Sequence, residues 1–248
     1  MIVIPLGGKS NRFSKVGIEK PKWSLFIGEE TVLTKATKSI LESCELSEEV
    51  LFIVPSNLKD IFDVSIDMTL SQNFKVSILN RETQGQAETV QIGLVQSKVK
   101  LSERLTIWCG DSSFDSTSFN FKTFRGNWLL TSKLMGDHWS FVDHIEGDAV
   151  EVVEKKRISQ DACTGLYGFE SVQTFLELDP SILLEGYQES FVAPLYNRLI
   201  KAGKLVKTYF IGSEKYYSFG TPDEVIESCQ RLKLEPPPEI LVRKSFPY

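Results

Sequence analysis

The sequence predicts an α/β fold in which helices cover both faces of a mostly parallel sheet. Short apolar runs alternate with helical patterns along the first half of the chain, and this β-α-β-α-β order is typical of such sheets. The 248 residues, of which 42% are hydrophobic and 25% charged, are enough for one large domain with a buried core. Because no linker or internal repeat divides the chain, we expect a single domain over 1–248.

Four buried strands and two helices account for the first half. Thr31–Cys44 has helical spacing with Thr31 as its N-cap, and Gln84–Lys98 carries an apolar side at helical spacing. Short apolar runs predict strands at Ile2–Leu6, Val50–Pro55, Phe74–Leu79 and Arg104–Cys109. In such sheets ligands bind at the carboxyl ends of the strands, and the segments GGKSNRF and GDSS both fall there.

The second half is predicted to add a small β-hairpin lobe. Trp139–Ile145 and Ala149–Lys155 are short strands separated by an EGD turn, which is the arrangement of a hairpin. Further strands are expected at Asn127–Leu134, Thr164–Phe169 and Val206–Gly212, and helices at Ser171–Leu178, Glu189–Ala202 and Pro222–Leu232. The tail over 235–248, EPPPEILVRKSFPY, is proline-rich and is expected to be extended.

Composition excludes several classes of protein. A net charge of −5 argues against a nucleic-acid partner, because such proteins need a strong positive field. No run approaches the ~20 apolar residues that span a membrane, so we expect no membrane segment. The four cysteines are scattered without a C-x-x-C pair, and neither histidine lies near one, which argues against structural zinc. We therefore expect a reduced, cytoplasmic protein.

Two glycines, a serine and an arginine follow the first strand in IVIPLGGKSNRF. The tetrad GGKS looks like the end of a P-loop, but that motif needs a glycine five residues before Gly8, where Val3 stands. Adjacent glycines can instead bring backbone N–H groups close to a ligand, while Arg12 and Lys20 hold its phosphates. A tight turn at Gly7 beside two solvated cations is the alternative.

Five stretches, in order, resemble the sugar-phosphate nucleotidyltransferase family. They are GGKSNRF followed by EKPKWSLFIGEETVL, then ETQGQAET, IWCGDSS, VVEKK with TGLYGF, and YYSFGTPDEV. Together they run from Ile2 to about Ile226. The resemblance implies a Rossmann-like α/β/α domain of three layers with a mostly parallel mixed sheet. Its nucleotide-binding half would cover about 1–125 and its acceptor-binding half about 126–234.

By this resemblance the protein transfers a nucleotidyl group from an NTP to a phosphorylated small molecule, such as a sugar 1-phosphate, and releases pyrophosphate. The product would serve surface polysaccharide biosynthesis. The reaction brings two polyanions together, so positioning and fixed positive charge would supply most of the catalysis. No covalent intermediate is needed, which agrees with the lack of a convincing Ser-His-Asp or Cys-His set.

The resemblance also assigns three catalytic residues. Arg12 would hold the NTP phosphates and steady the leaving pyrophosphate, and Lys20, the lysine of the K-P pair, would lie between the α-phosphate and the acceptor phosphate. Asp111 in GDSS would bind Mg²⁺, a hard cation suited to carboxylate and phosphate oxygens. Lys22 is an additional cation nearby, or equally a solvated lysine. The nucleotide would also contact Leu6, Gly7, Gly8, Gln84, Gly85 and Gly110.

Four residues are assigned to the acceptor. Glu154 and Lys155 match the family's E-K pair, in which the glutamate orients the acceptor and the lysine holds its phosphate. As bare residues they could also be the solvated end of a strand. Gly165 in TGLYGF would line the acceptor pocket. Glu189 would lie near the acceptor, although a carboxylate at a helix start is common for dipole reasons alone.

The chain departs from the family pattern at Ser218. The family has a metal-binding aspartate two residues before the glycine of its G-T-P motif, but YYSFGTP places a serine there. Mg²⁺ could then rest on Asp111, phosphates and water, because it readily keeps several waters. Asp223 or another acid could substitute, or catalysis could be weak or absent.

Other functions therefore stay open. One is a cytidylyltransferase that acts on a non-sugar phosphate such as phosphocholine, and another is a catalytically weak nucleotide-binding relative. A glycosyltransferase would need a D-x-D metal motif, where GDSSFD offers Asp111 and Ser113. The sequence does not determine the base, the acceptor or the oligomeric state.

Overall fold

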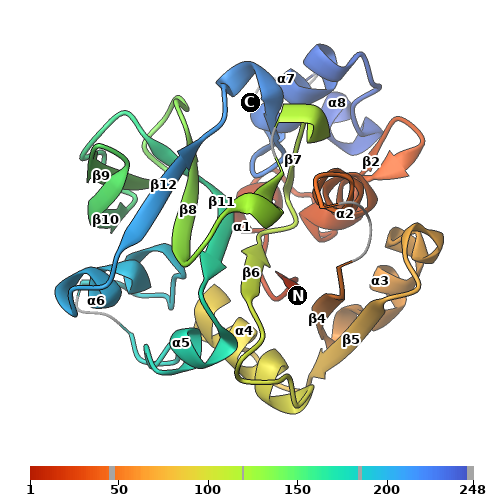
Figure 1. Cartoon of the computed structure of the whole chain (residues 1–248). Coiled ribbons are helices and arrows are strands. Elements are labelled where there is room, and N and C mark those ends of the chain that lie inside the picture. The colour runs from red at the N-terminus through yellow and green to blue at the C-terminus, as the bar shows by residue number, and fades with distance from the viewer. Residues whose placement is uncertain (45–47, 119, 184–185, 245–248) are drawn as a thin grey trace.

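A computed structural model describes residues 1–44, 48–118, 120–183 and 186–244. Within them, the strands form a nine-stranded central sheet in the order β5-β4-β1-β6-β11-β8-β12-β10-β9, seen in Figure 1. Four neighbouring strands on one side are parallel: β5 (Phe74–Leu79), β4 (Val50–Pro55), β1 (Ile2–Pro5) and β6 (Leu105–Trp108). The strands expected in the first half are confirmed, and β1 and β6 end side by side.

The other side of the sheet is mostly antiparallel. β11 (Ala162–Phe169) runs antiparallel to both β6 and β8 (Asn127–Ser132), while β12 (Val206–Phe210) is parallel to β8. The sheet ends in the expected hairpin, formed by β10 (Asp148–Glu154) and β9 (Ser140–Ile145). Both residues of its turn have positive φ, as a type I′ turn requires. The sheet is therefore mixed, and its parallel pairing is concentrated in the first half.

Successive residues of the inner strands pack alternately into two separate hydrophobic cores, one on each face of the sheet. Ile2, Ile4 and Phe52 pack on one face of the sheet, whereas Val3 and Leu51 pack on the other. This period of two is that of strands buried on both faces. Burying each such side chain stabilises the folded state by ~1.5–3 kcal/mol. Helices that cover both faces of the sheet are therefore favoured.

Helices from both halves cover the two faces, which confirms the three-layer α/β/α arrangement (Figure 1). One face carries α2 (Val32–Glu42) and α3 (Lys59–Ser65), and the other carries α4 (Gln86–Gln96), α5 (Val172–Leu176) and α6 (Tyr196–Lys201). The expected N-cap of α2 is confirmed, because Thr31 Oγ1 accepts a hydrogen bond from Thr34 N–H at 3.1 Å. None of the helices in the described ranges is both long and apolar enough to cross a bilayer.

The N-terminal and C-terminal segments meet in a third core. α1 (Asn11–Ser14) and the short strand β2 (Phe26–Ile27), which pairs with β3 (Glu30–Thr31), pack against α7 (Pro222–Leu232) and α8 (Pro238–Lys244) through buried residues of α1, β2, α7 and α8. Figure 1 shows α7 and α8, coloured blue, beside the orange-red β2. The loop that follows β1 is thus supported by residues more than 200 positions later in the chain.

The expectation of an extended tail over 235–248 is wrong for its described part, which contains α8. Pro238 stands at the first position of α8, where the N–H that proline lacks would have no intrahelical partner anyway. Glu239 in the first turn suits the helix dipole. Ile240 anchors the helix, since it is only 4% exposed. Residues 245–248 lie outside the described residues.

The structure differs from the sequence-based expectations at two more places. The helix expected over Glu189–Ala202 begins later, with a 3-10 turn at Ala193–Leu195 that leads into α6. Two short strands that the sequence did not predict, β7 (Ser112–Phe114) and β13 (Tyr216–Ser218), form a separate antiparallel pair directly after Gly110-Asp111. In both places the elements are too short to show a hydrophobic period.

Candidate active site

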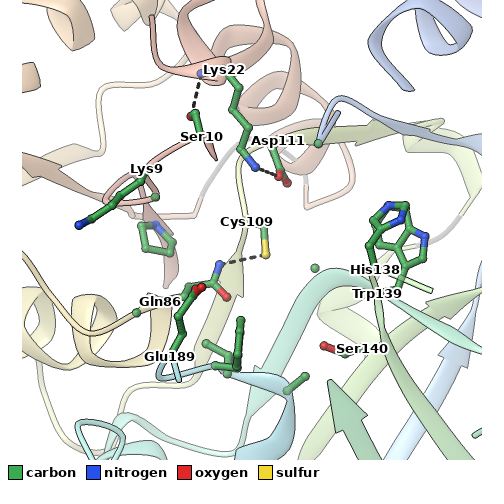
Figure 2. Close-up of a pocket in the computed structure, with 18 of the residues that line it drawn as sticks. Lys9, Ser10, Lys22, Gln86, Cys109, Asp111, His138, Trp139, Ser140 and Glu189 are labelled. Carbon is green, nitrogen blue, oxygen red and sulfur yellow. Dashed lines mark hydrogen bonds and ion pairs between the residues drawn. The ribbon is translucent and has the colours of Figure 1, made fainter. Parts of the chain in front are cut away.

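A cleft of about 790 Å³ opens beyond the carboxyl ends of β1 and β6. Figure 2 shows Lys22 and Asp111 on one side of it, and His138 with Trp139 on another. Eleven of the residues assigned from the sequence line it: Leu6, Gly7, Gly8, Arg12, Gln84, Gly85, Asp111, Glu154, Lys155, Gly165 and Glu189. The cleft therefore gathers segments from both halves of the chain into one site. Lys20 and Gly110 lie outside its lining.

The loop after β1 is shaped by Gly7 and Ser10. A Cβ added to Gly7 would lie 3.2 Å from Thr89 Oγ1, so only a small residue lets this backbone approach α4. Ser10 adopts a left-handed φ of 50°, and its Oγ accepts a hydrogen bond from Lys22 N–H at 3.2 Å (Figure 2). Arg12, in the short helix that follows, is exposed and lines the cleft. The loop thus presents backbone and cationic groups to the same space.

Lys22, and not Lys20, lines the cleft. Lys22 Nζ lies 2.5 Å from Asp111 Oδ2, and the two side chains are 24% and 20% exposed. Lys20 Nζ instead pairs with Glu239 Oε1 at 3.1 Å, and its side chain is 65% exposed. Pro21 separates the two lysines, and a 3-10 turn begins at Lys22. Of the two lysines, Lys22 therefore lies in the cleft beside Asp111, and Lys20 lies outside it.

Gly110 turns the chain so that Asp111 faces the cleft. Its φ is +71°, and a Cβ there would lie 2.8 Å from Ile4 Cγ2. The neighbouring Cys109 is not a candidate nucleophile, because burial raises the pKa of its thiol to about 12 and keeps it protonated at neutral pH. Gly165 covers this thiol closely, since a Cβ on Gly165 would lie 2.8 Å from Cys109 Sγ.

The loop that precedes α4 is held in place by Ser190 of the second half. Ser190 N–H donates to Gln84 O at 2.9 Å, and Ser190 O accepts from Ala87 N–H at 2.9 Å. A Cβ on Gly85 would lie 2.5 Å from both the N and O atoms of Ser190. Glu88 N–H donates to Ser190 Oγ at 3.2 Å. The assigned nucleotide residues Gln84 and Gly85 are thus fixed against the loop that carries Glu189.

Glu154 is a half-buried carboxylate at the end of β10, where it lines the cleft. Burial raises its pKa above the usual 4.5, although a hydrogen bond from Ser140 Oγ and the charge of Lys155 oppose this shift. Lys155 Nζ lies 4.5 Å from the ring centroid of Phe191, a cation–π contact. Glu189 is exposed on the same loop as Phe191. These groups offer hydrogen bonds, a cation and an aromatic face to a polar ligand.

Sequence reasoning missed two residues at the far side of the cleft. Glu224 Oε1 lies 2.6 Å from His138 Nε2, and Glu224 Oε2 accepts from Ser218 Oγ at 2.8 Å. Burial by itself would raise the pKa of Glu224, but the hydrogen bonds from His138 and Ser218 lower it below its usual range. His138 also packs against Trp139, with ring centroids 4.7 Å apart. In the sequence, Glu224 has the position of an ordinary helix-capping glutamate in TPDE, so it carried no distinctive signal.

Comparison with known proteins gave matches among solved structures. Neither a family model nor a curated protein matches this chain. A nucleoside-diphosphate-sugar pyrophosphorylase from Vibrio cholerae is 29% identical, with 93% of this chain and 100% of that chain covered and a TM-score of 0.81. An inositol-1-phosphate CTP transferase from T. maritima is 17% identical (94% and 95% covered, TM-score 0.71). A UDP-glucose pyrophosphorylase from Acinetobacter is 13% identical (92% and 91% covered, TM-score 0.69).

Proposed function

We propose that this chain, which has the sugar-phosphate nucleotidyltransferase fold, transfers a nucleotidyl group from an NTP to a phosphorylated small molecule and releases pyrophosphate. The observation that carries the proposal is the Lys22–Asp111 pair, which lies in a cleft lined by both halves of the chain. The 29% identity to the Vibrio cholerae pyrophosphorylase, over nearly the whole of both chains, supports it further.

The nucleotide would occupy the side of the cleft next to β1. The backbone at Gly7 and Gly8 would lie against the base and sugar, and Gln84 with Gly85 would contact the base. Arg12 would hold the β- and γ-phosphates, because its guanidinium can fork onto two phosphate oxygens. Lys22 would take the role that the sequence assigned to Lys20, a point charge between the α-phosphate and the acceptor phosphate.

In the reaction, a phosphate oxygen of the acceptor attacks the α-phosphorus, and the bond from that phosphorus to the bridging oxygen of pyrophosphate breaks. Lys22 and Arg12 would stabilise the charge that develops on the phosphate oxygens. Asp111 would hold Mg²⁺, whose positive charge would add to theirs when it is bound. Because no covalent enzyme intermediate forms, the protonated Cys109 is compatible with this chemistry.

The acceptor would lie against the hairpin β9–β10. Glu154 would accept hydrogen bonds from it, Lys155 would hold its phosphate, and Gly165 would leave room for it. Glu189 would contact it from the loop that Ser190 fixes. We further propose that the activated product feeds surface polysaccharide synthesis and that the reaction takes place in the cytoplasm, where nucleoside triphosphates are made.

One assay tests this proposal. The protein is incubated with Mg²⁺, each NTP in turn and a panel of phosphorylated sugars and amines that includes phosphocholine, while pyrophosphate is measured. Pyrophosphate release that requires both an NTP and an acceptor supports nucleotidyl transfer, and the active acceptor identifies the substrate class. Tight NTP binding without release for any acceptor would instead support the nucleotide-binding alternative.

A further inference from the structure

We propose that Glu224 supplies a second carboxylate to the metal site of the cleft, facing Asp111 across Gly220. The inference rests on the proposed function, because that function places Mg²⁺ at Asp111. Ser218, whose Oγ donates to Glu224 Oε2, offers only a neutral hydroxyl, which is a weak ligand for Mg²⁺. The second negative charge would therefore come from α7 rather than from β13.

The geometry brings the two carboxylates to one place. A Cβ added to Gly220 would lie 3.1 Å from Glu224 Oε2, 3.5 Å from Ser218 Oγ and 3.7 Å from Asp111 Oδ2, so all three oxygens surround this glycine. β13 and β7 produce this arrangement, because their antiparallel pairing sets Ser218 opposite Ser112, next to Asp111. Glycine at position 220 keeps the space between the acids open.

Each carboxylate is paired with a nitrogen-bearing side chain. Lys22 Nζ lies against Asp111 Oδ2, and His138 Nε2 lies against Glu224 Oε1. Two carboxylates that face one space repel each other, and the charge of Lys22 relieves that repulsion, while His138 adds a hydrogen bond to Glu224. A divalent cation between the acids would do the same. It would also release Lys22 toward the phosphates that it is proposed to hold.

The usual role of a glutamate at this helix position does not account for its contacts. α7 is capped by Thr221, whose Oγ1 accepts from Glu224 N–H at 3.2 Å. In a full capping box the carboxylate at this position turns back to the N-cap N–H. Here the two oxygens of Glu224 instead meet His138 and Ser218, inside the cleft lining. The side chain is thus aimed at the site and not at its own helix.

A site with two protein carboxylates suits Mg²⁺. Among the described residues, no group of three or more His, Cys, Asp or Glu side chains could hold a metal ion. Mg²⁺ prefers six oxygen ligands and is commonly held by one or two carboxylates, with water and substrate phosphates in the other positions. Asp111 and Glu224 would fill the two protein positions and leave the rest to the triphosphate and water.

The test measures metal binding without turnover. Mn²⁺ alone is titrated into the full chain, and the free Mn²⁺ signal is followed by electron paramagnetic resonance. We expect one bound Mn²⁺ in the natural chain and at least a ~10-fold weaker affinity in both Glu224→Gln and Asp111→Asn, since even the partners of metal ligands alter affinity by that factor. Glu227→Gln, an exposed acid of the same helix outside the cleft lining, is the matched control and should bind as the natural chain does.

A double variant separates loss of a ligand from loss of structure. Ser218→Asp in the Glu224→Gln chain returns a carboxylate to the site, and we expect it to restore most of the Mn²⁺ affinity. Unchanged Mn²⁺ affinity in Glu224→Gln, or absence of Mn²⁺ binding by the natural chain at millimolar concentration, would overturn the proposal. Because the titration contains no NTP or acceptor, its result is independent of the pyrophosphate assay, and either proposal can fail alone.

Discussion

Lys22 Nζ and Asp111 Oδ2 lie 2.5 Å apart, although 89 residues separate them in the chain. One follows the loop after β1, and the other follows β6, and these parallel neighbours end at the same edge of the sheet. In the proposed function, this pair would bring a cation and a metal-binding acid to one phosphate. Several expected outcomes depend on this placement.

Removing the amine of Lys22 should reduce turnover far more than removing that of Lys20. We expect Lys22→Ala to lower kcat by at least ~100-fold, the cost of one preorganised charge donor at a reacting group. Lys20→Ala removes only an exposed ion pair with Glu239, so its kcat should fall by no more than about fivefold. Steady-state pyrophosphate release measures both. A larger loss in Lys20→Ala would return the catalytic role to Lys20.

Replacing Arg12 should reduce activity as strongly as replacing Lys22. Arg12→Ala is expected to lower kcat/KM for the NTP by at least ~100-fold, because a bidentate contact to the leaving phosphates is lost. Arg12→Lys should recover only part of this, since an ammonium group is a point charge. The matched control is Arg231→Ala, at an exposed arginine outside the cleft lining. Near-natural kinetics in Arg12→Ala would remove Arg12 from the proposed site.

A methyl group at Gly85 should destabilise the protein. The added Cβ would meet the backbone N and O of Ser190 at 2.5 Å, and backbone atoms cannot move aside as a flexible side chain can. We expect Gly85→Ala to lower the free energy of unfolding by ~1–3 kcal/mol, measured by urea denaturation. Gly8→Ala is the control for stability, because no heavy atom lies within 4 Å of its added Cβ. Equal stability of the two variants would show that Ser190 does not fix this loop.

Glu154→Gln should be more stable than the natural chain at neutral pH. Burial raises the pKa of Glu154 above 4.5 in the folded protein. The stability that this raised pKa contributes is therefore fully present below pH 4.5, and it is lost as the pH rises through the pKa of the folded state. Glutamine does not ionise. The melting temperature of Glu154→Gln minus that of the natural chain should therefore increase between about pH 4 and about pH 8. Glu151→Gln, on the exposed side of the same strand, should show no such trend. The KM for the acceptor should rise in Glu154→Gln, since a proposed contact is weakened.

The sequence could predict elements whose residues are buried in a regular pattern. β4 matches its expected bounds because its sequence is one continuous apolar run, β5 because apolar residues alternate with Lys75 and Ser77, and α7 because Thr221 caps it. α1, β7 and β13 were missed, since three or four residues show no period. The tail was misjudged because prolines argue against helix continuation but favour a helix start.

The residues of the candidate site were found where a motif fixes the backbone, as at Gly7 and Asp111. Lys20 and Lys22 flank one proline, and only the folded loop shows which ammonium group points into the cleft. Glu224 could not be found from local sequence, because its proposed role depends on β13 being paired with β7. That contact joins segments about 100 residues apart.

The third core also has a consequence for biosynthesis. Phe13 is completely buried and Ile240 almost so within the same cluster, so this cluster cannot close until α8 has left the ribosome. During synthesis, the apolar side chains beside the loop that follows β1 stay exposed to solvent, while the central strands are already available to pair. A nascent chain of this protein should therefore be a chaperone client until α8 emerges, and acquire catalytic competence only then.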